Sequence, residues 1–205
     1  MDTAFPRFIE KMGAQMDCQT VPESSIALYT GKLPDQLIDY WQEHGWGGYG
    51  KGLFWTVNPQ EYEGVLTHWI EGTCLDTRDT YHLIARSAFG DLYLWGETTG
   101  PSVVINSVFS RCAIQNLGLR PGEMNKMVKN FFLSVEVKYN NFAGLFERAH
   151  RKLGTLTRDE MYGFVPALML GGSEHIDNLE RVSTLEHLTL LSQLAELEPY
   201  GFSDL

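Results

Sequence analysis

Few residues in this chain combine the type and the spacing that catalysis requires. The carboxylates of Asp35 and Asp39, and those of Glu61 and Glu63, form two close pairs that could take part in acid–base chemistry. Asp35 and Asp39 share one face of a helix, where two like charges are slightly destabilising. Glu63 also suits the first turn of a helix, where the helix dipole favours a negative charge. A structural role, or contact with a partner protein, explains these acids better than catalysis does.

Nucleophiles and metal ligands are equally sparse. The sequence has no G-x-S-x-G elbow to expose a serine nucleophile. None of the six histidines lies four residues from another, H-E-x-x-H is absent, and the three cysteines form no C-x-x-C pair. One weak metal candidate is the loop that holds Glu174, His175 and Asp177. We therefore expect no catalytic residue, no metal and no cofactor.

Residues 45–50, Gly-Trp-Gly-Gly-Tyr-Gly, match the G-x-G-x-x-G pattern of dinucleotide sites. Such a site needs a strand before the glycines and a helix after them, because the pyrophosphate binds at the helix N-terminus. Here the surrounding pattern predicts the reverse order. We therefore interpret the glycines as a helix-to-strand turn that requires positive φ angles.

The elements that would position these residues are clearest in residues 33–70, which contain four of the five tryptophans. A helix from Pro34 to Gly45 is followed by a turn over 46–51 and a strand over 53–57. Asn58 then favours the N-cap of a second helix, because its side chain can accept a hydrogen bond from the first turn. We expect three of the tryptophans to be buried in the core: Trp41, Trp55 and Trp69.

The rest of the chain alternates between helical and extended patterns. We expect helices over 4–13, over 123–135, from Asn141 to Gly154, and from the capping box at Ser183 onward, the last with Leu185, Leu188, Leu191 and Leu194 buried. Thr157 to Glu160 also has capping-box spacing. We expect strands over 81–87, 91–96 and 102–110, a short extended segment within 162–172, irregular structure over 20–31 and a loose tail from Glu198.

These patterns predict the α+β fold class. The expected architecture is an antiparallel meander packed with helices, with an N-terminal Trp-rich helix–turn–strand–helix unit and a mostly helical C-terminal half. Strands give way to helices near 111–122, which divides the chain into residues 1–115 and 116–205. This boundary is soft, so the two parts are either two domains or one continuous fold.

Charge is distributed unevenly along the 205 residues, whose net charge is −10. Residues 1–73 carry ten acids and four bases, residues 111–152 carry three acids and eight bases, and residues 153–205 carry nine acids and two bases. An acidic protein does not approach phosphate backbones unaided and favours a basic partner. Plain solubility is the alternative explanation, and we read the basic segment as solvated helix faces. No apolar run is long enough for a membrane helix, and the first residues lack the apolar core of a secretion signal, so we expect a cytoplasmic protein.

Two stretches resemble known families. P-x-x-L-x-x-Y-W-x-x-x-G-W, a glycine-rich turn and G-L-F-W-x-x-N-P, within residues 34–59, resemble the GAD-like domain of bacterial proteins. M-Y-G-F-V-P-A-L over 161–168, L-G-G over 170–172, N-L-E-R-V over 178–182 and E-H-L over 186–188 resemble a second domain. That domain is the C-terminal domain of type VI secretion immunity proteins that pair with DNase effectors, and it commonly follows a GAD-like domain.

The resemblance implies a cytoplasmic, non-catalytic antidote that binds and blocks a nuclease toxin delivered between bacteria. It implies no cofactor and no direct contact with nucleic acid or membrane, and it leaves the oligomeric state open. The acidic first 73 residues are compatible with it, because they would be steered to the basic surface of a DNase. Exposed aromatics beside acids would anchor the contact. The residues we expect at this surface are Asp39, Glu43, Trp46, Tyr49, Glu61, Tyr62 and Glu63.

Two other functions stay open at this point. The chain could be a small metal-dependent hydrolase that uses the loop of Glu174, His175 and Asp177. It could also be a regulatory or scaffold module that binds an intracellular protein unrelated to toxins. Metal analysis would test the first, and the identity of the neighbouring gene would test the second.

Overall fold

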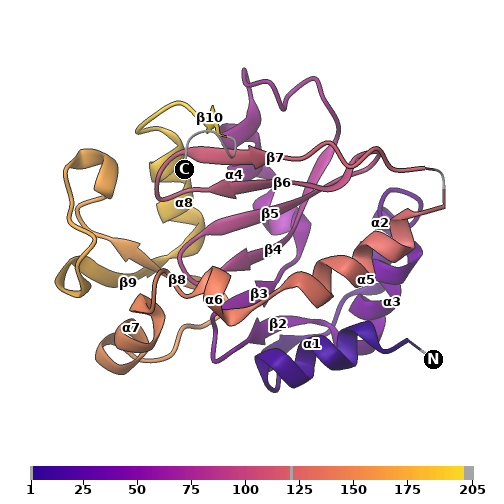
Figure 1. The fold of residues 1–205 in the computed structure, drawn as a ribbon, viewed down its shortest axis with the longest axis horizontal. Helices are drawn as coiled ribbons and strands as arrows, with labels where there is room; N and C mark the ends of the chain where they lie inside the picture. The colour runs from indigo at the N-terminus through magenta and orange to yellow at the C-terminus, as the bar shows by residue number, and fades with distance from the viewer. Residues whose placement is uncertain (1, 121, 201–205) are drawn as a thin grey trace.

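The computed structural model describes residues 2–120 and 122–200, and one large sheet forms its centre (Figure 1). Its strand order is β1-β2-β3-β4-β5-β6-β7-β10. The strands are β1 (Met16–Gln19), β2 (Trp46–Tyr49), β3 (Phe54–Thr56), β4 (Tyr81–Ser87), β5 (Asp91–Gly96), β6 (Gly100–Asn106), β7 (Arg111–Ile114) and β10 (Glu198–Pro199). Neighbours from β1 to β7 pair antiparallel, and only β10 joins its neighbour β7 in parallel. The predicted antiparallel meander is therefore confirmed.

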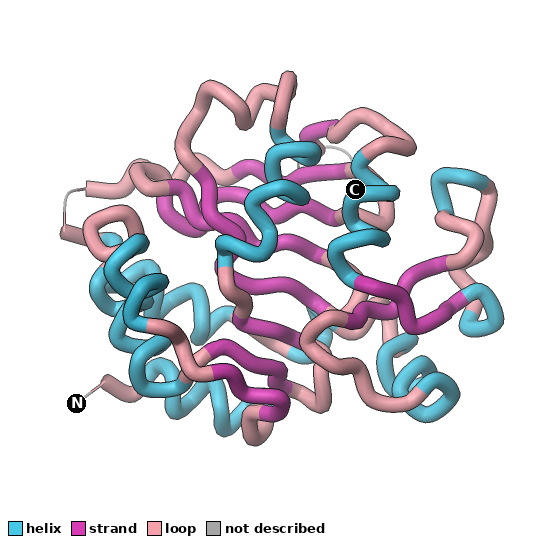
Figure 2. The backbone as a smooth tube through the Cα atoms, turned by 180° about the vertical axis from the view of Figure 1, so that it is seen from behind, coloured by secondary structure: helices cyan, strands magenta, loops and turns pink. Residues whose placement is uncertain are grey.

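Helices cover both faces of this sheet. One face carries α4 (Pro59–Ile70) and α8 (Thr184–Ser192), which lie in front of the strands when the molecule is seen from behind (Figure 2). The other face carries α1 (Ala4–Met12), α5 (Met124–Ser134) and α6 (Val137–Asn140) (Figure 1). Beyond one end of the strands lie α2 (Glu23–Tyr29) and α3 (Asp35–His44). The α+β fold class is confirmed.

A smaller unit lies beside the opposite end of the sheet (Figure 1). It is a two-stranded antiparallel pair with one α-helix and two short 3-10 helices, namely β8 (Glu160–Phe164), β9 (Leu179–Ser183), α7 (Leu145–Leu153), η1 (Leu168–Leu170) and η2 (Ile176–Asn178). The amide of Tyr162 in β8 donates to the carbonyl of Ala88, 2.8 Å away, at the end of β4. The small unit is thus hydrogen-bonded to the large sheet.

The Trp-rich stretch folds largely as its local signals predict. Trp41, Trp55 and Trp69 are buried, and the Asn58 side chain accepts a hydrogen bond from the backbone N–H of Gln60 at the start of α4. Gly45 follows α3 with a φ of 73°. A side chain there would be strained and would place its Cβ 2.4 Å from the Gln19 carbonyl oxygen, so this position requires glycine.

Two local predictions in the N-terminal half are wrong. Residues 23–29 form α2 and are not irregular, because Pro22 is extended and the helix begins directly after it. Residues 46–49 form β2 and are not a turn. Gly48 belongs in this strand because the ring of Trp55 on the neighbouring strand lies against it, 2.9 Å from where a Cβ would stand. The glycines therefore allow close packing between strands.

The C-terminal half also departs from prediction in detail. In α8, Leu188 and Leu191 are buried as expected and Leu194, just beyond it, is half-buried, but Leu185 is exposed. Thr157 and Glu160 form the expected capping-box hydrogen bond, yet a strand follows. The segment from Glu198 was expected to be loose, but β10 pairs there with β7; residues 201–205 lie outside the described part of the chain.

An aromatic cluster joins the two halves of the chain across one face of the sheet. The ring of Phe132 in α5 lies 4.8 Å from that of Phe5 and 5.3 Å from that of Phe8, both in α1. It also meets Tyr40 of α3 edge-on at 5.5 Å. Aromatic pairs at such separations add to the free energy of hydrophobic burial. Helix α5 is consequently held by residues more than ninety positions earlier in the sequence.

Candidate protein-binding site

The four acids expected to contact a partner are exposed, on two helices. Asp39 and Glu43 lie one turn apart on α3, and Glu61 and Glu63 lie near the start of α4. The Glu61 carboxylate accepts a hydrogen bond from the Asn58 amide at 3.3 Å. The Tyr29 hydroxyl donates to the Glu63 carboxylate at 3.4 Å. These contacts leave the carboxylates at the surface, so that all four can meet a partner.

The three aromatic residues expected beside these acids are buried, so the expectation that they form exposed anchors is wrong. Trp46, Tyr49 and Tyr62 expose 2%, 0% and 5% of their surface. Trp46 packs edge-on against Trp41 at 5.5 Å, and Tyr49 packs against Phe8 at 4.7 Å. Burial raises the pKa of the Tyr49 hydroxyl. Strand β2 is covered on both faces, which sequence periodicity in a glycine-rich segment did not reveal.

Charge is segregated between the helices. Helices α2, α3, α4 and α8 together contain seven Asp and Glu residues and no Lys or Arg. Helices α1, α5, α6 and α7 contain eight Lys and Arg residues and two Glu. The helices on one face of the sheet, α4 and α8, contain three Glu residues and no Lys or Arg, and the helices on the other face, α1, α5 and α6, contain five Lys and Arg residues and one Glu. We call the face of α4 and α8 the acidic side; α2 and α3 lie beyond one end of the strands, and α3 packs against α5 (Figure 1). The acidic side is suited to a basic protein surface.

A buried arginine lies beneath the acidic side, and sequence analysis missed it. The Arg86 side chain of β4 is fully buried, with its guanidinium 5.1 Å from the centre of the Trp55 ring. Its Nε donates to the Tyr62 hydroxyl at 3.1 Å, and its Nη2 donates to the carbonyls of Arg158 and Glu160 at 2.7 and 3.0 Å. An arginine directly after the apolar residues 83–85 of a predicted strand was the signal that could have revealed it. Arg86 fixes α4 and the start of β8 to the sheet.

An ion pair joins β1 to the segment just before β8. The Arg158 guanidinium donates to Asp17 Oδ1 at 2.8 Å, and the Arg158 backbone N–H donates to Asp17 Oδ2 at the same distance. The hydrogen bond from Arg158 lowers the pKa of the Asp17 carboxyl. Both residues line a narrow cavity of about 20 Å³ together with Trp46, Glu61 and Tyr62. Three of the seven expected residues thus meet here. The other four lie elsewhere: Asp39 and Glu43 on α3, Glu63 beside Tyr29, and Tyr49 in the aromatic cluster.

The loop considered as a metal site is arranged differently from a ligand cluster. The Lys152 ammonium lies 2.6 Å from Asp177 Oδ1 and lowers the pKa of that carboxyl. His175 Nδ1 accepts a hydrogen bond from the Asp177 backbone N–H. Across residues 2–120 and 122–200, no three His, Cys, Asp or Glu side chains are grouped to hold a metal ion. None of the helices in these ranges has the length and apolar character needed to cross a membrane.

Comparisons with known proteins give two family matches, one after the other. Residues 3–109 match the GAD-like domain, and residues 125–195 match the C-terminal region of the type VI secretion immunity protein Tdi1. No curated protein matches the chain. The crystal structure of Atu4351 from Agrobacterium tumefaciens has a similar fold, with a TM-score of 0.81 and 20% sequence identity over 91% of this chain and 87% of that one. The predicted order of the two regions is confirmed.

Proposed function

The chain belongs to the GAD-like domain family, and from that premise and the second match we propose that it is an immunity protein that neutralises a type VI secretion toxin by binding it. The observation that carries this proposal is the match of residues 125–195 to an immunity protein. The match covers α5 to α8, of which α5 packs against β6 and α8 packs against α4 of the first region. The function follows from a stable contact surface and requires no catalytic residue in this chain.

We further propose that the toxin is a DNase whose DNA-binding surface is covered by the acidic side of this protein. A DNase must present Lys and Arg side chains to bind phosphates. Helices α4 and α8 on this side offer carboxylates and no Lys or Arg to such a surface, and α2 and α3, beyond one end of the strands, add further carboxylates. Asp39, Glu43, Glu61 and Glu63 are the residues we place at this contact. Because the DNA to be protected lies in the cytoplasm, we place the protein there too.

Co-expression in a toxin-sensitive bacterium tests the proposal. The proposed partner, a nuclease toxin sought among the products of the neighbouring genes, is induced with the wild-type chain, or with an empty vector as the control. Protected cells keep their chromosomal DNA intact and continue to grow, and the two proteins co-purify in a fixed ratio. If the DNA is degraded equally with and without this chain, the immunity function is refuted. Binding to an unrelated intracellular protein, without protection, would indicate a regulatory module instead.

A further inference from the structure

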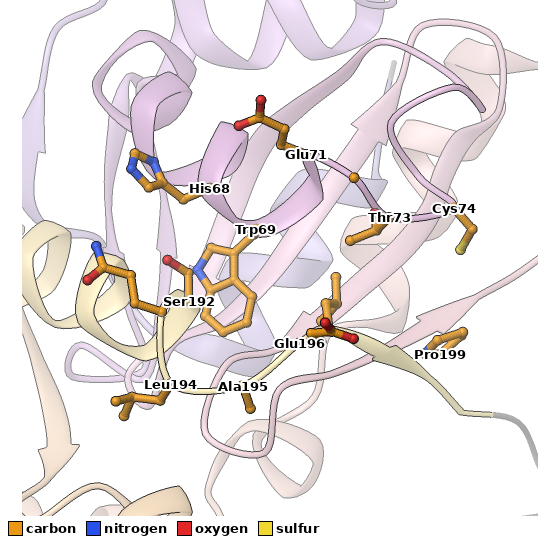
Figure 3. Close-up of a pocket in the computed structure, with 13 residues that line it drawn as sticks. His68, Trp69, Glu71, Thr73, Cys74, Ser192, Leu194, Ala195, Glu196 and Pro199 are labelled. Carbon is orange, nitrogen blue, oxygen red and sulfur yellow. The ribbon is translucent and has the colours of Figure 1, made fainter.

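The acidic side contains an open cleft that neither family region forms alone. Its volume is about 710 Å³, and its two walls are the end of α4 with the loop that follows and the segment that follows α8 (Figure 3). The first wall is residues 68–74, which lie inside the GAD-like match. The second wall is residues 192–197 with Pro199, at and beyond the end of the second match. The cleft exists only because the two regions pack together.

The polar groups that line the cleft are mainly acceptors. Glu71 and Glu196 are exposed and come from opposite walls, with the Glu71 carboxylate at the rim and directed away from Glu196 (Figure 3). The Nδ1 atom of His68 is bonded to the Gly64 carbonyl at 2.6 Å, so in the neutral ring the proton lies on Nδ1 and Nε2 is an acceptor. None of the lining residues is Lys or Arg. Two carboxylates and an imidazole nitrogen favour a cationic donor.

Trp69 adds a buried donor to the same wall. The Trp69 indole lies between the two walls and is 2% exposed (Figure 3). Its Nε1–H has no acceptor among residues 2–120 and 122–200. A buried indole N–H normally finds a partner, and a backbone carbonyl of an inserted loop would supply one. Leu194 and Leu197, both half-buried, give the cleft an apolar floor for the stem of a long side chain.

We infer that this cleft receives an arginine- or lysine-bearing loop from the DNA-binding surface of the toxin. The cation pairs with Glu196 while Glu71 adds negative charge at the opposite rim, its aliphatic stem lies on Leu194 and Leu197, and the loop backbone accepts from Trp69. The inference rests on the proposed function, because that function supplies the basic partner. It adds a specific anchor to the general charge attraction of the acidic side. Pockets that lose their water when the partner binds hold the residues that dominate protein–protein affinity.

Two kinds of variant test the cleft against a catalytically inactive form of the neighbouring nuclease, with affinity measured by calorimetry. Glu71→Lys combined with Glu196→Lys reverses the charge of the walls. Its control, Glu10→Lys with Glu147→Lys, makes the same charge change on exposed residues of α1 and α7. Ala195→Trp fills the cleft without a charge change, and its control is Ala14→Trp at another exposed alanine. Melting temperatures establish that each variant is folded.

The two cleft variants are expected to weaken binding by about tenfold or more, and the controls by less than about threefold. Wild-type affinity in both cleft variants, or equal losses in their controls, would overturn the inference while leaving the proposed function intact. Failure of the wild-type chain itself to bind would overturn both. The wild-type measurement therefore separates the two outcomes.

Discussion

Arg86 introduces a charge into the core with no carboxylate beside it. Its partners are a tyrosine hydroxyl, backbone carbonyls and the face of Trp55. Carbonyl groups at the start of β8 would be buried without a partner if the guanidinium were removed. The arginine is therefore a structural link between β4, α4 and β8, and it supports the surface on which Glu61 and Glu63 lie.

We predict that Arg86→Met destabilises the protein by about 2–4 kcal/mol, because it leaves buried acceptors unsatisfied. Urea denaturation followed by circular dichroism measures the change in the free energy of unfolding. Arg148→Met is the matched control, since Arg148 is exposed on α7, and we expect it to change stability by less than about 0.5 kcal/mol. Equal stability of the two variants would show that Arg86 does not have this role.

Titration of Asp91 should make the free energy of unfolding depend on pH. Burial raises the pKa of its carboxyl to about 6, although the Ser87 hydroxyl donates to it at 2.7 Å. An unfolded aspartate titrates near 3.8, so the folded protein holds a proton that the unfolded chain has lost. The stability that this proton contributes is present below pH 3.8, falls as pH rises to about 6 and is constant above that value.

Asp91→Asn should remove this pH dependence. We predict that the variant gains stability relative to wild type, by on the order of 1–3 kcal/mol, between about pH 4 and pH 7. Urea unfolding of both proteins at several pH values gives the difference in their free energies of unfolding directly. The contributions of the other carboxyl groups cancel in this difference because both proteins contain them. A difference that does not vary with pH would contradict the assignment.

At the scale of elements, the turn between β4 and β5 is packed under β8 and α8. Gly90 has a φ of +88°, and a Cβ there would lie 2.6 Å from Ser107 Oγ and 2.7 Å from Met161 Cε. Gly72 also has a positive φ, of +74°, but a Cβ there would meet nothing within 4 Å. The two glycines share backbone strain and differ in the space around them.

We predict that Gly90→Ala costs more stability than Gly72→Ala by about 1–3 kcal/mol, because only the former overpacks the core. Both alanines suffer the strain of a left-handed backbone, so the difference isolates packing. Thermal or urea unfolding of the two variants provides the comparison. Costs that agree within experimental error would mean that the small unit does not press on this turn.

Elements with strong local signals could be predicted from sequence, and elements fixed by distant partners could not. Helix α4 was found because Asn58 and an apolar face mark it in the sequence. Strand β1 is four residues long and β10 is two, and their pairing depends on strands elsewhere in the chain. The burial of residues at the candidate site could not be predicted for the same reason. Trp46 looked like a surface residue beside glycines, but strands and helices far away in sequence cover it.

At the scale of the whole molecule, contacts cross repeatedly between residues 1–115 and 116–205. The Tyr93 hydroxyl donates to Asn140 Oδ1 at 2.8 Å, and β10 completes the edge of the large sheet beside β7. Asp17 and Arg158 join the two parts at the other edge. We propose from these contacts that the two regions fold as one cooperative unit.

The full chain should therefore unfold in a single transition, with circular dichroism and tryptophan fluorescence giving the same midpoint. Expressed separately, residues 1–115 would expose the faces that α5 and α8 cover, and we expect neither fragment to unfold cooperatively. Limited proteolysis of the fragments provides an independent check. A protease-resistant fragment with a sharp transition would instead establish two autonomous domains.

We propose that the molecule acts by occupying the surface of a toxin, one protein for one protein. Titrating the chain into a fixed concentration of the neighbouring nuclease, well above the dissociation constant, tests this claim most directly. DNA cleavage should fall linearly and reach zero at one molar equivalent, independently of incubation time. Undiminished cleavage at several equivalents, or inactivation of many toxin molecules by one molecule of this protein, would contradict the account.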